Sequence, residues 1–84
     1  MAKVVVYTKT PCPYCDRAKT FLKNKGVPYE ERHITDPDEM IALKKRTGWM
    51  TFPLIFVGEK LIGGFDDMNA LDKAGEFDKL LKAP

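Results

Sequence analysis

The residues of this chain best suited to redox chemistry are two cysteines, Cys12 and Cys15, with two residues between them. They are the only cysteines among 84 residues. They follow the β-branched run Val4–Val6 and precede a helical pattern, so the pair lies between a predicted strand and a predicted helix. A Cys-x-x-Cys pair in that context favours a catalytic dithiol. A static disulfide and half of a zinc site remain open as alternatives.

The local sequence gives Cys12 the role of the attacking thiol. Cys12 is placed at the helix N-cap and Pro13 at the first helical position, which suits the preset φ and missing N–H of proline. There the Cys12 sulfur accepts hydrogen bonds from the backbone N–H groups of Tyr14 and Cys15. The helix dipole and the nearby cation of Lys9 also favour a thiolate. Such surroundings lower a thiol pKa from about 8.5 toward roughly 3.5–7.5.

Cys15 is predicted to face the core. At about 100° per residue, it shares a stripe roughly 120° wide with Ala18, Phe21 and Leu22. Two cysteines three residues apart at a helix start also lie within the Cα separation of about 4.4–6.8 Å that a disulfide tolerates. We therefore expect Cys15 to be the sheltered, resolving thiol.

Length and composition indicate one water-soluble domain spanning residues 1–84. Apolar residues make up 44% and charged residues 31% of the chain. A net charge of +2, without a basic block interleaved with aromatics, argues against a nucleic-acid partner. The apolar runs are far shorter than a membrane span. The chain begins without a signal-peptide pattern, so we expect a cytoplasmic protein. Thiols are kept reduced in the cytoplasm, where a cysteine pair is more often catalytic or metal-binding than structural.

The first part of the chain reads as a strand–helix–strand unit. The strands are predicted over Lys3–Tyr7 and Tyr29–Ile34, and the helix over Pro13–Lys25, ended by Gly26. This order implies a parallel strand pair with a right-handed crossover.

A second helix is predicted from Asp36 as N-cap and Pro37 as first residue to about Arg46. Its Met40 and Leu43, together with Ile41, are expected to face inward. The elements that follow are strands over Leu54–Val57 and Lys60–Ile62, a helix capped by Asp66 or Asp67 and ending near Ala74, and a short helical turn over Glu76–Lys82.

The predicted fold class is therefore α/β, with the order β-α-β-α-β-β-α. The two-residue turn between the last two strands is too short for a crossover, so they form an antiparallel hairpin. Helices are expected on both faces of a four-stranded mixed sheet.

Three motifs in this order resemble those of the glutaredoxins. They are Tyr7-Thr8-Lys9 before Cys12-Pro13-Tyr14-Cys15, then Thr51-Phe52-Pro53, then Gly63-Gly64-Phe65-Asp66-Asp67. The resemblance covers nearly the whole chain and implies a thioredoxin-like fold. It also implies a glutathione-dependent thiol–disulfide oxidoreductase that reduces glutathione mixed disulfides and protein disulfides.

The resemblance also implies a glutathione-binding groove. Phe52-Pro53 would be a cis peptide. The Phe52 backbone would pair with the cysteinyl part of glutathione as an added strand does. The family usually has valine at the position that Phe52 occupies here. Thr51 and Tyr14 would line the groove. The other reading of Thr51-Phe52-Pro53 is an ordinary proline-initiated strand, and that of Tyr14 is a surface aromatic.

Both ends of glutathione have predicted partners. Gly63-Gly64 would let the backbone approach the γ-glutamyl end closely. The Asp66 N–H would bind the carboxylate of that end, and the Asp67 carboxylate would bind its ammonium group. Alternatively, the two aspartates merely cap a helix. Lys9 would bind the glycine carboxylate.

Two positions depart from the family pattern. Many relatives have a glutamine or arginine on the second helix that helps to anchor the glycine carboxylate of glutathione, and this chain has Met40 there. Arginine is also common just before the threonine, where this chain has Met50. Lys44, one turn after Met40, is a candidate replacement anchor. His33 is expected to be a surface residue, and Trp49 a partly exposed residue at the groove rim.

The resemblance implies no tightly bound cofactor, and glutathione as co-substrate. The expected partners are glutathione and glutathionylated or disulfide-containing proteins, with ribonucleotide reductase as one candidate. The protein itself is expected to be a monomer. One alternative is a redoxin of the same fold that thioredoxin reductase reduces and that serves ribonucleotide reductase. Another is an iron–sulfur scaffold bridged by two chains, because one chain lacks four tetrahedral ligands.

Overall fold

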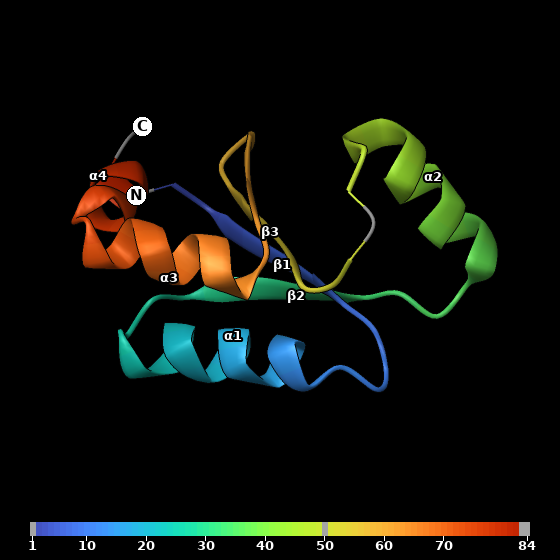
Figure 1. The fold of residues 1–84 in the computed structure, drawn as a ribbon, viewed down its shortest axis with the longest axis horizontal. Coiled ribbons are helices and arrows are strands. Elements are labelled where there is room, and N and C mark those ends of the chain that lie inside the picture. The colour runs from blue at the N-terminus through green and yellow to red at the C-terminus, as the bar shows by residue number, and fades with distance from the viewer. Residues whose placement is uncertain (1, 50, 83–84) are drawn as a thin grey trace.

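The computed structural model describes residues 2–49 and 51–82. Its centre is a four-stranded mixed sheet with the order β2-β1-β3-β4 (Figure 1). The strands are β1 (Val4–Thr8), β2 (Tyr29–His33), β3 (Leu54–Val57) and β4 (Lys60–Gly63). The helices are α1 (Pro13–Asn24), α2 (Pro37–Thr47), α3 (Phe65–Lys73) and α4 (Glu76–Lys82). The predicted order is confirmed, and the expected last turn is the helix α4.

The strand pairing agrees with the sequence prediction. Strand β1 pairs in parallel with β2 and antiparallel with β3, and β3 pairs antiparallel with β4. The parallel register places Tyr7 opposite Arg32 and Thr8 opposite His33. This register brings polar side chains of β1 and β2 together on both faces of the sheet.

Helices cover both faces of the sheet, and alternate residues of each strand face opposite sides. Figure 1 shows α1 and α3 running alongside the strands, whereas α2 lies at one end of the sheet. The core on the α1 and α3 face consists of Val4, Val6, Ala18, Leu22, Ile55, Val57, Met68, Phe77 and Leu81. The smaller core on the α2 face consists of Val5, Tyr7, Ile34, Leu43 and Leu54.

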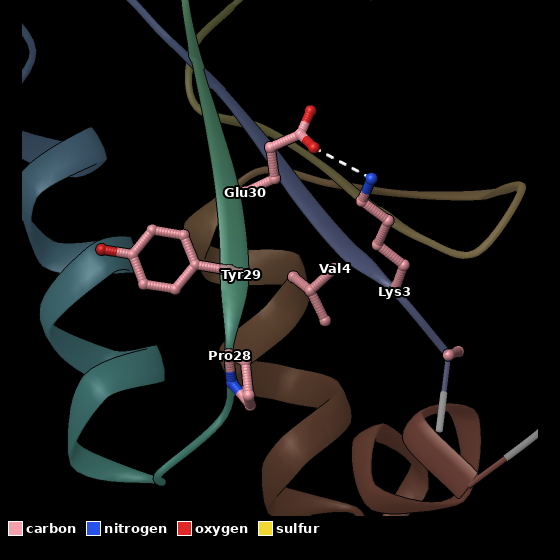
Figure 2. Close-up of a pocket in the computed structure, with 6 residues that line it drawn as sticks. Lys3, Val4, Pro28, Tyr29 and Glu30 are labelled. Carbon is pink, nitrogen blue, oxygen red and sulfur yellow. Dashed lines mark ion pairs between the residues drawn. The ribbon is translucent and has the colours of Figure 1, made fainter.

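The alternation is visible where β1 and β2 begin. Figure 2 shows Tyr29 directed toward α1, with Lys3 and Glu30 joined by an ion pair on the other side of the strands. Lys3 Nζ lies 2.9 Å from Glu30 Oε1. A cavity of about 330 Å³ lies here, and its lining includes neither cysteine. Charged side chains therefore gather on the α2 face of the sheet, outside its small core.

The predicted start of α2 is confirmed. The Asp36 carboxylate accepts a hydrogen bond from the Asp38 N–H at 3.0 Å, and Gly48 ends the helix with a φ of 71°, a conformation that favours glycine. One predicted inward residue is wrong: Ile41 is 51% exposed, because the narrow contact face of α2 is filled by Leu43 and Met40. The part of the chain that the structure describes contains no helix that is both long and apolar enough to cross a membrane.

Candidate active site

The two cysteines lie at the junction of β1 and α1, and they form a disulfide. Their Cα atoms are 5.2 Å apart, within the range that such a bond requires. Cys12 is the N-cap of α1 and Pro13 its first residue, as predicted. Of the two expected donors, the Cys15 N–H bonds the Cys12 sulfur at 3.1 Å. The same donor would stabilise a thiolate on Cys12 after reduction.

The two sulfur positions differ in solvent access. Cys15 is 2% exposed, and the predicted stripe is confirmed, because Ala18 and Leu22 are buried beside it on α1. Cys12 is only partly buried. An incoming substrate can thus reach Cys12, whereas α1 holds Cys15 against the core.

Most of the residues predicted to bind glutathione line one cavity of about 360 Å³. Among the residues that the structure describes, its lining is Tyr14, Trp49, Thr51, Phe52, Pro53, Gly64, Phe65, Asp66 and Asp67. The Phe52-Pro53 peptide is cis, as the resemblance implied. The loop before β3 thus meets the start of α3 and the first turn of α1 in one groove.

The start of α3 differs from the prediction. Its N-cap residue is Gly64, and neither Asp66 nor Asp67 occupies that position. Asp67 is the third helical residue, and its Oδ2 accepts a hydrogen bond from the Gly64 N–H at 2.9 Å. This bond is the reverse arm of a capping box. The N-cap was misplaced because a glycine at that position has no side chain to mark it in the sequence. Asp67 is nevertheless exposed and lines the groove.

Gly63 closely approaches two of the protein's own side chains, Asp67 and Trp49, which the sequence did not reveal. Its φ is 121°, and a Cβ there would lie 2.5 Å from Asp67 Oδ2 and 3.0 Å from the Trp49 ring. A side chain at Gly63 would therefore displace the Asp67 carboxylate. At Gly64, by contrast, a Cβ would meet nothing closer than the Pro53 oxygen at 3.6 Å, an ordinary contact.

Aromatic side chains form two walls of the groove. Trp49 is half-buried, as expected at the rim, and its buried Nε1 has no hydrogen-bond partner among the described residues. Phe65, which sequence reasoning did not single out, lies 6.3 Å from Tyr14 between ring centroids. Its place between the glycine pair and Asp66 was the signal that could have identified it.

The cysteines line a second cavity of about 350 Å³, which shares no lining residue with the groove. Lys9 lies in this second cavity and not in the groove. Its Nζ is 5.7 Å from the centre of the Phe52 ring, so Lys9 adjoins both cavities. The predicted site residues therefore line two cavities, the groove and the second cavity that contains the cysteines.

A polar cluster in the second cavity was not predicted. The buried Thr8 hydroxyl donates to Glu31 Oε2 at 2.8 Å and lies 3.1 Å from His33 Nδ1. Lys19 pairs with Glu31 at 3.2 Å. The hydrogen bond from Thr8, followed by that from Lys19, holds the pKa of Glu31 below its ordinary value. His33 is exposed, as expected, but it belongs to this cluster beside the dithiol.

The role of Lys44 as a replacement anchor for glutathione on α2 stays a prediction. Met40 packs against the core on the α2 face, and Lys44 is exposed on α2. Lys44 lines neither cavity beside the cysteines. Met50 lies outside the described residues.

Comparisons with known proteins agree with this geometry. A family model described as Glutaredoxin matches residues 4–62. The chain is 45% identical to a glutaredoxin of Pseudomonas aeruginosa, covering 99% of this chain and 100% of that protein. It is 49% identical to glutaredoxin 3 of Escherichia coli, covering 98% and 100%. The crystal structure of a buckwheat glutaredoxin–glutathione complex superposes with a TM-score of 0.86 at 32% identity, covering 95% of this chain and 76% of that one. The chain belongs to the glutaredoxin family, whose members are thiol–disulfide oxidoreductases.

Proposed function

We propose that this protein is a glutathione-dependent oxidoreductase that reduces glutathione mixed disulfides and protein disulfides through Cys12 and Cys15. One observation carries the proposal: the partly exposed Cys12 sulfur, bonded to the Cys15 N–H at the start of α1, lies beside a groove with the lining expected for glutathione. The buckwheat relative, solved as a complex with glutathione, supports the choice of co-substrate.

The reaction follows from the unequal exposure of the two sulfurs. The Cys12 thiolate attacks the glutathionyl sulfur of a mixed disulfide and expels the other thiol as a thiolate. A second glutathione then attacks the glutathionyl sulfur on Cys12, which releases glutathione disulfide and regenerates the Cys12 thiolate. With a protein disulfide, Cys12 first forms a mixed disulfide with the substrate and expels one substrate thiolate. Cys15 then attacks the Cys12 sulfur, which breaks the mixed disulfide, releases the second substrate thiolate and forms the Cys12–Cys15 disulfide seen in the structure. Two glutathiones then reduce that disulfide.

Glutathione would span the two cavities. The γ-glutamyl carboxylate would bind the free N–H groups at the start of α3, where the helix dipole is positive. The γ-glutamyl ammonium would bind Asp67, the cysteinyl part the Phe52 backbone, and the glycine carboxylate Lys9. Lys9 adjoins Phe52 on the side of Cys12, so this path brings the glutathione sulfur toward Cys12.

The decisive experiment measures reduction of a small glutathione mixed disulfide by the purified protein. We expect turnover with glutathione as the only reductant and saturation as the glutathione concentration rises. Turnover with thioredoxin reductase but not with glutathione would contradict the proposal and assign the redoxin function. No turnover with either reductant would contradict both.

Asp67→Asn should weaken glutathione use about fivefold, because an exposed charge-assisted contact contributes roughly 1 kcal/mol. The asparagine oxygen can still accept from the Gly64 N–H, so the start of α3 is preserved. Steady-state kinetics with glutathione measure the effect, and the fluorescence of Trp49, the single tryptophan, reports on the groove. Glu59→Gln, in the exposed β3–β4 turn, is the control for net charge. Equal kinetics for the two variants would show that Asp67 only supports the helix.

The wider setting follows from the same chemistry. The chain would act as one domain over residues 1–84 and as a monomer. A cytoplasmic location suits a dithiol that must be reduced again after each turnover. Ribonucleotide reductase is a candidate among its disulfide-containing protein partners.

A further inference from the structure

A fourth cavity lies on the α2 face of the sheet, among residues that the redox chemistry does not use. Its volume is about 290 Å³, and Tyr7, Arg32, Arg46 and Phe56 are among its lining residues. None of its lining residues lines either cavity beside the cysteines. Strand alternation explains the separation, because Tyr7 faces away from Thr8, which belongs to the dithiol side.

Two arginines from distant parts of the chain converge on one buried hydroxyl. Arg32 Nη1, from β2, donates to the Tyr7 oxygen at 3.0 Å, and Arg46 Nη2, from the last turn of α2, donates to it at 3.2 Å. Tyr7 is only 7% exposed. Because the phenol oxygen accepts both bonds, its own proton remains available as a third donor.

The charges around this hydroxyl are unbalanced. Glu30 is shared between Lys3, at 2.9 Å, and Arg32 Nε. Among residues 2–49 and 51–82, Arg46 has no ion pair with a carboxylate. Burial by itself would raise the pKa of Tyr7, but the hydrogen bonds from Arg46 and Arg32 outweigh it, and the pKa lies below its ordinary value. Three cations thus face one carboxylate.

We propose that this cavity binds an oxyanion of the phosphate class, either inorganic phosphate or the terminal group of a phosphomonoester. The groups with free capacity there are donors: the remaining N–H groups of Arg32 and Arg46 and the Tyr7 hydroxyl. The planar guanidinium fork matches the oxygen spacing of a phosphate, which a lysine ammonium does not. Tyr7 and Phe56, whose ring centroids are 5.8 Å apart, give the site an aromatic wall.

Titration with inorganic phosphate, followed by NMR of the backbone amides at constant ionic strength, tests this proposal. We expect saturable shifts at Tyr7, Gly58 and Arg46. Arg46→Ala should lower the affinity about five- to tenfold, as expected for one partly solvated charge-assisted contact. Arg46→Lys, which keeps the charge and loses the fork, should fall between Arg46→Ala and the unmodified protein. Lys45→Ala, an equal charge change on an exposed neighbour, should have no effect.

Phenyl phosphate distinguishes the two sources of the anion. Tighter binding than inorganic phosphate would assign a phosphomonoester whose ring uses the aromatic wall, and equal binding would assign free phosphate. Linear shifts that sodium chloride reproduces would overturn the proposal. An equal loss of affinity in Lys45→Ala and Arg46→Ala would also overturn it, because the effect would then be general screening.

Discussion

Replacing Cys12 by serine should reduce both disulfide-reducing activities to the uncatalysed background. Every proposed step forms or breaks a bond at the Cys12 sulfur, and a serine hydroxyl is not ionised at neutral pH. The N-cap itself should survive, since serine is a favoured N-cap residue, so the fold should be retained. Assays of a glutathione mixed disulfide and of a protein disulfide measure the loss, and a thermal melt is the control. Residual activity of either kind in the folded variant would contradict the assigned role of Cys12.

The same argument predicts how the reactivity of Cys12 depends on pH. In the reduced protein, the Cys15 N–H and the start of α1 should hold the Cys12 pKa well below about 8.5, the ordinary value for a thiol. The alkylation rate of a Cys15→Ser variant, which leaves one thiol, gives this pKa directly. A midpoint near the ordinary value would rule out activation by the helix start.

Much of the fold could be predicted because its signals are local. Pro13 after Cys12 marks the start of α1, and Asp36 before Pro37 marks the start of α2. The two-residue turn between β3 and β4 leaves only an antiparallel hairpin. Each of these signals lies within a few residues of the feature that it fixes, so no knowledge of tertiary contacts was needed.

The features that were missed depend on contacts between distant segments. The Thr8 and His33 contact requires the parallel register of β1 with β2. The meeting of Arg32 with Arg46 requires, in addition, the position of α2 beside Tyr7. The division of the site between two cavities likewise depends on where the Lys9 side chain lies relative to Phe52. Periodicity and spacing within the sequence carry no information on such contacts between distant segments.

Cys15→Ser should separate the two activities. Cys15 is buried on the inner stripe of α1 with Ala18, so it is not the thiol that a substrate meets first. If Cys12 alone accepts glutathione and a second glutathione releases it, the variant should keep deglutathionylation. The rate should even rise, because the side reaction that closes the Cys12–Cys15 disulfide is removed.

Reduction of protein disulfides should be lost in the same variant. The mixed disulfide between Cys12 and the substrate protein can no longer be resolved by Cys15, which removes the internal route of release. The serine hydroxyl can bond back to a helix carbonyl, so its structural cost is modest. Ala18→Ser places the same hydroxyl on the same buried stripe and should lower stability without separating the activities. If Cys15→Ser stays folded and loses both activities together, glutathione release at Cys12 is not a one-thiol reaction, and the site works only as a dithiol.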